Sequence, residues 1–516
     1  MVSPSAGASP PITDPATAAN NDAQRWDRAF ARAAGSAPSD FNAVRLLLDA
    51  GENFPAWLEA INKAERYILF ESYLILNDPL GRLFAEALAA RAKDGVRVCA
   101  IFDWLGSWGG RALWAQLREA GVQMRSFNPP RFDSPLAWLS RDHRKSIIVD
   151  GNVGFVSGLC IDAAWEGDPE KRMEPWRDTG VEIRGPAVAD LEHAFVAIWN
   201  ICGGEAMGAL PAAIVTKEKV GDVRVRVVAG VPGIGGTYRL DLLVASVARR
   251  QLWLTDAYFV GTSAYTQALR AAAADGVDVR LLVPGASDIP ALSPLSRAGY
   301  RPLLESGVRV FEWNGTMLHA KTAVADGTWA RVGSTNLNLA SWMSNYELDV
   351  AIENAAFAQA MATQYEMDLD RATEIVLTSR NRVRRSEPRA EVAKESGTPM
   401  ARRAASGSAG RAAAGAVSVG SALGAALTNR RTLGAAEAGL LGTMAVIVLG
   451  FVVVAALWPR VIAWPLAVIG GWLALSWLLK SLSLWRGGRN GPEVDTALNP
   501  RPHSQAGRSD HGDPRG

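Results

Sequence analysis

The sequence has few of the residues on which several common classes of site depend. Only three cysteines occur among 516 residues, with no C-x-x-C pair, which excludes a disulfide framework and disfavours a thiolate zinc site. Histidine is also scarce, at five, and His503 and His511 lie in the polar tail. Lys and Arg number 54 against 52 Asp and Glu, so no basic excess exists for binding nucleic acid. Any catalytic histidine is therefore His143, His193 or His319.

The amino-terminal segment lacks the pattern of a secretory signal peptide. Its first 25 or so residues are rich in Ser, Pro, Ala and Thr, with no basic stretch followed by an apolar run. This composition predicts a disordered leader over residues 1–41.

The middle of the chain, from about residue 42 to 372, alternates short β-rich runs with amphipathic helical stretches. Strands are expected at 67–70, 96–102, 252–255 and 279–283, and helices at 80–92, 111–120 and 265–274. The run Asp94–Val98 matches Asp275–Val279, which indicates an internal repeat. We therefore predict an α/β protein with two similar lobes, each a mixed sheet flanked by helices, at 42–205 and 221–380 with a connector at 206–220.

The carboxy-terminal part changes composition twice. Residues 381–435 are rich in Arg, Ala and Gly and read as a linker, and residues 481–516 as a disordered basic tail. Within 436–480, the runs 438–458 and 461–479 contain no charged residue, and each is about 30 Å long as a helix. They predict a transmembrane helical hairpin; the alternative is a buried helical pair.

Arginines and lysines flank this hairpin, whereas its turn holds only Arg460. The positive-inside rule then predicts that both ends, and the catalytic region, face the cytoplasm of a bacterial inner membrane. The unpaired cysteines agree with that compartment.

One motif occurs twice, at equivalent places in the repeat. His143, Lys145 and Asp150 form H-x-K-x4-D in the first half, and the second half has the same spacing. That second copy consists of His319, Lys321 and Asp326. A small turn follows each copy after six residues: Ser157-Gly158-Leu159-Cys160, then Gly333-Ser334-Thr335-Asn336.

The spacing suggests chemistry on a phosphodiester. In a strand, residues i and i+2 share a face, so the lysine lies beside the histidine and lowers its pKa. The lysine also binds a phosphate oxygen, and Ser157, Ser334 and Asn336 offer further donors. One histidine attacks phosphorus while the other protonates the leaving alcohol, and no metal or cofactor is needed. His143 is our choice of nucleophile and His319 of acid; His193, in a helical pattern, is expected to be structural.

These motifs resemble those of the phospholipase D superfamily, and more narrowly its bacterial cardiolipin synthase branch. The likeness spans about residues 42 to 372 and includes Phe70-Glu71-Ser72-Tyr73 and Asp256-Ala257-Tyr258-Phe259. The resemblance implies a covalent phosphohistidine intermediate and transfer of a phosphatidyl group to a lipid alcohol. Glu347 matches the family's acidic residue that orients a catalytic histidine. Asp178 is the candidate for the same role in the first half. Asp150 and Asp326, although part of the motifs, are expected to stabilise loops.

Two features depart from the family pattern. Cys160 stands where the first Gly-Gly-x-Asn has its amide, and a thiol cannot replace two strong donors. The hairpin is carboxy-terminal, whereas many relatives carry theirs before the catalytic lobes.

The expected function is transfer of phosphatidyl groups between phosphatidylglycerol molecules at the inner membrane. A phospholipase D that hydrolyses phospholipids to phosphatidic acid is the alternative. A nuclease is disfavoured by the charge balance and the hairpin, and a catalytically decayed scaffold by the two intact His-Lys pairs.

Overall fold

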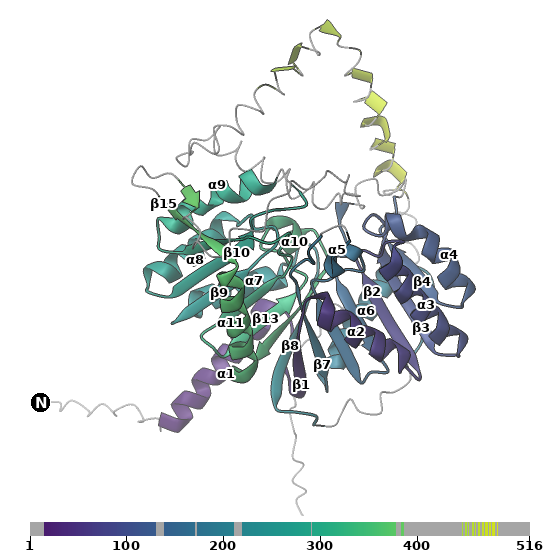
Figure 1. The fold of residues 1–516 in the computed structure, drawn as a ribbon, viewed down its shortest axis with the longest axis horizontal. Helices are drawn as coiled ribbons and strands as arrows, with labels where there is room; N and C mark the ends of the chain where they lie inside the picture. The colour runs from purple at the N-terminus through teal and green to yellow at the C-terminus, as the bar shows by residue number, and fades with distance from the viewer. Residues whose placement is uncertain are drawn as a thin grey trace, which may run out of the picture. The chain divides into compact units, whose positions relative to one another are not determined.

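The computed structural model describes residues 15–130, 139–170, 173–210, 219–289, 292–377 and 383–385, together with scattered helical positions between 446 and 482. The strands between residues 39 and 385 form one continuous 16-stranded sheet. Its two halves follow one another across the sheet, with β1 and β8 at the centre (Figure 1).

The first half contributes seven strands. In sheet order they are β1 (Ser39–Leu48), β7 (Thr179–Arg184), β6 (Val153–Ser157), β5 (Lys145–Val149), β2 (Tyr67–Ser72), β3 (Arg97–Asp103) and β4 (Gln123–Phe127). The second half repeats this order and then adds two strands at the edge. These are β8 (Val223–Gly230), β14 (Glu347–Glu353), β13 (Trp329–Gly333), β12 (Thr322–Ala325), β9 (Gln251–Thr255), β10 (Asp278–Pro284), β11 (Arg309–Trp313), β15 (Ala372–Leu377) and β16 (Val383–Arg385).

The pairing pattern confirms the predicted repeat. In each half the three outer strands of the repeat, β2-β3-β4 and β9-β10-β11, are parallel, and the remaining pairs are antiparallel. The predicted elements between residues 67 and 120 and between 252 and 283 all form, with bounds within a few residues of those expected.

Helices cover both faces of the sheet and define its cores. In the first half α2 (Asp49–Asn62), α3 (Pro79–Lys93) and α4 (Arg111–Glu119) bury one face. In the second half α7 (Gly236–Val247), α8 (Ser263–Ala274) and α9 (Leu292–Leu304) do the same. The other face carries α6 (Ala187–Ile201) and α11 (Ala355–Asp370), whose apolar side chains join strands of both halves in one shared core. That shared core holds the halves as a unit.

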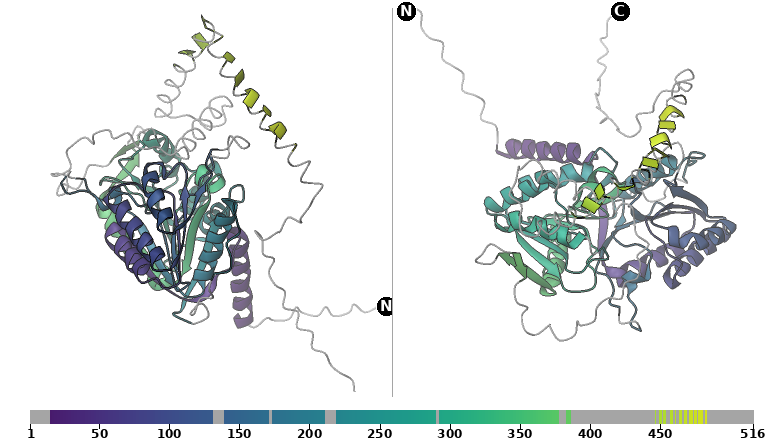
Figure 2. Two further views of the ribbon diagram at one scale, coloured as in Figure 1. Left: turned by 90° about the vertical axis from the view of Figure 1, so that its right-hand side faces the viewer. Right: turned by 90° about the horizontal axis from the view of Figure 1, so that it is seen from above.

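The amino-terminal prediction was wrong from residue 15 onward. Pro15–Ala34 forms helix α1, the purple helix in Figure 2. It contacts α7 and packs Phe30 against the core of the second half. Strand β1 begins at Ser39 and joins the two halves by pairing with both β7 and β8. The polar composition of this segment led to the wrong prediction, because a helix that is stabilised by tertiary packing needs only a few apolar residues.

The carboxy-terminal predictions lie largely outside the described residues. Strand β16 falls within the predicted linker, which was expected to begin at residue 381. Because β16 pairs with β15, the sheet extends to Arg385 and any linker begins after it. Most of the remaining linker, much of the hairpin and nearly all of the tail are not described. Among the described residues, no helix is long and apolar enough to cross a membrane.

Candidate active site

The histidine of the first motif is held by a carboxylate from the second half. His143 lies just before β5, and its Nδ1 is 2.8 Å from Oε2 and 3.1 Å from Oε1 of Glu347, the first residue of β14. The predicted pairing of Glu347 with a motif histidine is thus present, and it crosses between the halves.

The second histidine shows the reciprocal arrangement. Nδ1 of His319 lies 2.8 Å from Oδ2 of Asp178, which immediately precedes β7 of the first half. We expected Asp178 to serve the first half; the structure instead brings it to the histidine of the second. The error arose because sequence order alone does not reveal that the two halves exchange carboxylates.

Backbone hydrogen bonds fix this exchange. The His143 amide donates to the Tyr346 carbonyl (2.9 Å), and the Tyr346 amide donates to the Arg141 carbonyl (2.8 Å). In the mirror arrangement the His319 amide donates to the Arg177 carbonyl at 2.7 Å. The backbone amide of each histidine is therefore hydrogen-bonded to the residue that directly precedes its carboxylate partner in the sequence.

The two carboxylates are oriented by different donors. Glu347 accepts from the Ser334 hydroxyl (2.6 Å) and from the Asn345 amide (3.2 Å). Asp178 accepts from the Trp165 indole N–H (2.8 Å). Gly158 occupies the position equivalent to Ser334, and a Cβ there would lie only 2.2 Å from Asp178 Oδ1. The Asp178 carboxylate lies so close to the backbone just after β6 that position 158 has no room for a serine side chain.

Both histidines are neutral near pH 7. Burial lowers the pKa of His143 to about 4, with Glu347 opposing the shift and Lys145 contributing to it. Burial, followed by the positive charge of Lys321, lowers the pKa of His319 to about 3. The lysines lower the histidine pKa values in the predicted direction, although burial is the larger cause of the shift.

The lysines are almost fully buried beside the histidines. Each ammonium donates to the carbonyl of its own motif histidine, Lys145 to His143 and Lys321 to His319. Burial lowers the pKa of both lysines, that of Lys321 to about 8. Each lysine also influences the histidine of the other motif electrostatically, so the two halves contribute to a single charged centre.

The partner carboxylates stay ionised despite their burial. Burial alone would raise the pKa of Asp178, but His319 and Lys321 outweigh it and leave the pKa below the usual value. The pKa of Glu347 is lowered in the same way by His143 and Lys145. A carboxylate beside Nδ1 favours a proton on that nitrogen, which leaves the lone pair on Nε2; at His319 the Lys321 ammonium also lies 2.9 Å from Nδ1.

The two turn serines differ from their expected phosphate-binding roles. The Ser334 hydroxyl is committed to Glu347, and the Ser157 hydroxyl accepts from the Leu159 amide at 3.2 Å. Asn336 is buried, its amide nitrogen is 3.5 Å from the Ser341 hydroxyl, and its Oδ1 has no partner among the described residues. Cys160 is buried beside Lys145, and burial raises the pKa of its thiol.

The motif aspartates stabilise loops, as expected. Asp150 accepts from the backbone amides of residues 65, 66 and 67, and Asp326 from those of residues 249, 250 and 251. Both aspartates have positive φ, at 55° and 51°, so they form equivalent tight turns at the far end of β5 and β12. His193 is exposed on α6 and takes part in neither pair.

Aromatic rings surround the histidines, and the sequence analysis did not predict this. The Tyr73 ring centroid lies 5.0 Å from that of His143, and the equivalent Tyr258 ring lies 5.9 Å from that of His319. Trp165 and Trp176 also contact His319, at 5.1 and 5.7 Å. The repeated Glu-Ser-Tyr and Asp-Ala-Tyr stretches were a usable signal for the tyrosines, whereas nothing in the pattern marked Trp165.

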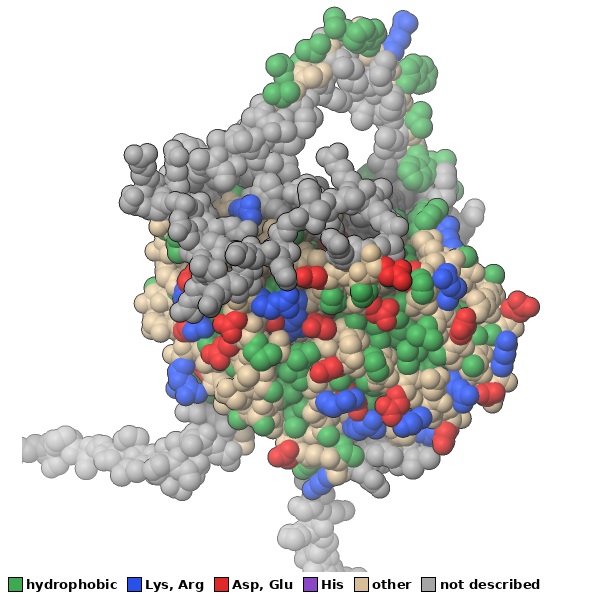
Figure 3. Space-filling model, viewed as in Figure 1, with side chains coloured by type: hydrophobic (Ala, Val, Ile, Leu, Met, Phe, Trp, Pro, Cys, Tyr) green, Lys and Arg blue, Asp and Glu red, His purple; other side chains and the backbone are tan. Residues whose placement is uncertain are grey.

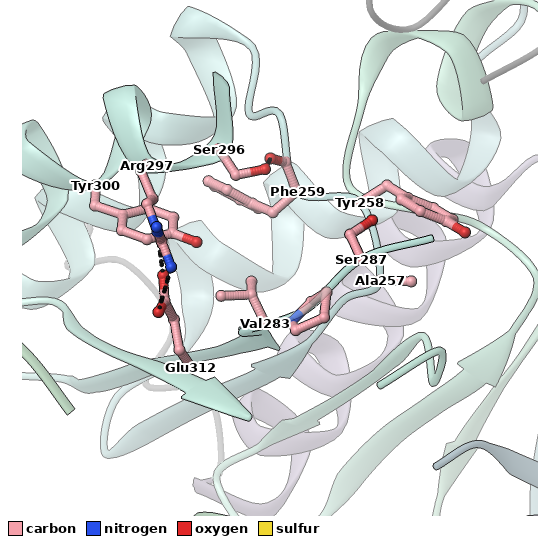
Figure 4. A pocket seen from close by; sticks show the side chains of 10 residues that line it. Ala257, Tyr258, Phe259, Val283, Ser287, Ser296, Arg297, Tyr300 and Glu312 are labelled. Atoms are coloured by element: carbon pink, nitrogen blue, oxygen red, sulfur yellow. Dashed lines mark hydrogen bonds and ion pairs between the residues drawn. The ribbon is translucent and has the colours of Figure 1, made fainter. Parts of the chain in front are cut away.

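A pocket adjoins the second half of the centre. It encloses about 320 Å³ of atom-free space, part of it open to solvent, at the carboxyl ends of β9, β10 and β11. Tyr258 lies at one end, and Arg297 forms a 2.7 Å ion pair with Glu312 at the other (Figure 4). Across the described part of the chain, no group of His, Cys, Asp and Glu residues is arranged to hold a metal ion.

The depressed histidine pKa values predict acid sensitivity of the fold. Below about pH 6.5 the unfolded chain protonates its histidines, whereas the folded protein keeps His143 and His319 neutral to about pH 4 and 3. The unfolded state then binds more protons, so the free energy of unfolding falls as pH falls through this window. Each histidine should contribute about 1.4 kcal/mol per pH unit.

Denaturant titrations at pH 7, 6 and 5 measure this slope. His143→Gln and His319→Gln should each reduce it relative to the wild type and to His193→Gln, the matched substitution at an exposed site on α6. A slope that neither active-site substitution alters would contradict the neutral-histidine assignment.

Comparisons with known proteins agree with this geometry. Residues 244–369 match the family described as "Cardiolipin synthase, PLD-like domain". The chain is 32% identical over 350 residues to the cardiolipin synthase of Alkalihalophilus pseudofirmus, covering 66% of this chain and 69% of the relative. It is 33% identical over 353 residues to cardiolipin synthase A of Pseudomonas aeruginosa strain LESB58, covering 67% and 70%.

A solved structure shows the same fold at lower sequence identity. The phosphatidylserine synthase of Haemophilus influenzae Rd KW20 superposes with a TM-score of 0.51 and 15% identity, over 64% of this chain and 87% of that one. Taken with the repeated motifs and the relatives, these findings show that the chain belongs to the phospholipase D superfamily, in its cardiolipin synthase branch.

Proposed function

We propose that this protein is a membrane-bound cardiolipin synthase that transfers a phosphatidyl group from one phosphatidylglycerol to another and releases glycerol. The observation that carries the proposal is the pair of crossed His–carboxylate contacts, His143 with Glu347 and His319 with Asp178. Together with two buried lysines they make one centre suited to a phosphodiester.

The first step forms a phosphohistidine. Nε2 of His143 attacks phosphorus of the donor lipid, and the bond from phosphorus to the glycerol headgroup oxygen breaks. His319, which takes up one proton on Nε2 when the phosphodiester binds, gives that proton to the oxygen, so free glycerol leaves and the phosphatidyl group stays on His143. Glu347 and Asp178 act as positioning residues that hold Nδ1–H and stabilise positive charge on each ring.

The second step returns the enzyme to its starting state. A hydroxyl of the acceptor phosphatidylglycerol attacks phosphorus, His319 accepts its proton, and the bond from phosphorus to His143 breaks. Cardiolipin is the product, and no nucleotide or oxidant is consumed. An acceptor positioned in the site can compete with water because effective molarities reach about 10⁵ M or more.

Charge balance explains how only one histidine carries the proton. Two ammonium groups and two carboxylates surround two neutral rings. A bound phosphodiester adds one negative charge, which favours uptake of one proton by a histidine. Lys145, Lys321 and the buried Asn336 supply the donors for the phosphate oxygens in this proposal.

The membrane part of the proposal rests on the carboxy-terminal segment. The runs 438–458 and 461–479 contain no charged residue, and each is long enough as a helix to cross the hydrocarbon core of a bilayer. This length and composition support the predicted hairpin. The flanking positive charge supports a cytoplasmic catalytic region at the inner membrane.

Nucleic acid is a poorer substrate class for this centre. On the face shown in Figure 3, Lys and Arg are interspersed with Asp and Glu and form no continuous basic tract. Phosphate-backbone binding draws its affinity from such tracts. The superfamily's nuclease activity is therefore the weaker alternative here.

Reconstituted enzyme tests the reaction directly. In vesicles of phosphatidylglycerol, without ATP or an activated lipid, the full chain should produce cardiolipin and free glycerol in equal amounts, measured by lipid mass spectrometry and a glycerol assay. His143→Ala and His319→Ala should each abolish both products, whereas His193→Ala should retain them. Release of phosphatidic acid alone would replace the synthase with the phospholipase D alternative.

The positioning carboxylates provide a second test. Glu347→Gln and Asp178→Asn should each lower kcat by about 10²- to 10⁴-fold with little change in KM, because an amide donor at Nδ1 favours the tautomer that blocks Nε2. Glu353→Gln is the matched control, since Glu353 ends the same strand and pairs with Arg226 instead. Wild-type kcat in either active-site variant would show that the crossed pairs have no role in turnover.

A further inference from the structure

Residues 104–111 form the loop that leads from β3 into α4, and Arg111, the first residue of α4, lies among three indole rings. The Arg111 guanidinium lies 3.6 Å from the ring centroid of Trp108, 4.8 Å from that of Trp104 and 5.7 Å from that of Trp114. Among the described residues Arg111 has no ion-pair partner, and its buried Nε has no hydrogen-bond acceptor. Within this part of the chain, ring faces hold the positive charge in place.

The same loop presents an aromatic surface to the outside. Trp108 is 48% exposed, and Trp104 packs edge-on against it with ring centroids 4.6 Å apart. Indoles with one apolar side and one polar edge are the side chains that favour the boundary between lipid headgroups and acyl chains. A guanidinium held beside them is complementary to a phosphate group.

This loop is built into the catalytic centre. The Ser107 hydroxyl donates to the Tyr73 carbonyl (3.1 Å), and the Tyr73 ring packs on His143. A Cβ at Gly106 would lie 2.2 Å from the Tyr73 carbonyl oxygen, so the loop backbone approaches the tyrosine as closely as glycine allows. Asp103 accepts from the Gly106 amide on one side and from Arg141 on the other.

We propose that Trp104, Trp108 and Arg111 form a docking site for the surface of an anionic bilayer, with Arg111 on a lipid phosphate and Trp108 at headgroup depth. The site would seat the first half of the catalytic centre against the membrane that supplies its substrate. It rests on the proposed function only in taking a lipid as that substrate. The occupant is a bilayer because the half-buried Arg111 cation, beside the exposed Trp108, complements anionic headgroups, and because the loop is continuous with the proposed catalytic centre.

A purely structural role for Arg111 and the surrounding indole rings makes a different prediction. If the rings and Arg111 only brace the loop, their loss disturbs Tyr73 and His143 and slows the reaction with every substrate. If they dock the bilayer, only substrate within an anionic membrane is affected.

The test uses the full chain in proteoliposomes. Trp108→Ala and Arg111→Gln are assayed on phosphatidylglycerol within the vesicle, and on a monomeric short-chain phosphatidylglycerol added to vesicles of phosphatidylcholine. We expect each variant to lose about fivefold in rate on the membrane substrate and less than twofold on the monomeric one. Trp26→Ala, 46% exposed on α1, and Arg118→Gln, exposed on α4, are matched controls that should behave as wild type.

Hydrogen exchange gives a readout that does not depend on turnover. Amides of residues 104–111 in the wild-type protein should exchange more slowly in vesicles that contain phosphatidylglycerol than in phosphatidylcholine alone, and Arg111→Gln should remove the difference. Equal losses on both substrates, wild-type rates on both, or exchange indifferent to lipid charge would each overturn the docking site. If the wild type releases only phosphatidic acid, the synthase proposal fails, and the same comparisons on that product still test the docking site.

Discussion

The candidate centre depends on one exchange: each half of the sheet gives its carboxylate to the histidine of the other. Glu347 cannot reach His143, nor Asp178 His319, unless β8 and β1 pair at the centre of the sheet and the shared core under α6 and α11 is intact. Neither half alone contains both a motif histidine and the carboxylate that contacts it. Folding of the two halves into one unit is therefore a condition of the chemistry rather than a background to it.

The exchange also breaks the symmetry of the repeat. A serine hydroxyl orients Glu347, whereas an indole N–H orients Asp178 and glycine stands where that serine would be. Cys160 replaces the amide that Asn336 supplies in the second half. The two histidines thus have similar pKa shifts but different neighbours, as expected if one attacks phosphorus and the other transfers protons.

How far the sequence leads can be judged from particular residues. Strong periodicity predicted β2, α3, β3 and their counterparts, and the repeated spacing identified His143 and His319. Long-range contacts were out of reach: nothing local shows that Asp178 crosses to His319, or that Ser334 serves Glu347 rather than phosphate. Helix α1 was missed for the same reason, since its stability comes from packing on α7.

The central claim is that both motifs work as one centre through a covalent intermediate, and a single trapping experiment tests it most directly. Enzyme quenched in acid-free conditions within the first turnover on phosphatidylglycerol should carry a phosphatidyl adduct on His143, located by mass spectrometry of the digested protein. Glu347→Gln, which leaves the ring present but misoriented, should carry little or none. Turnover to cardiolipin with no adduct on either His143 or His319 would contradict the account.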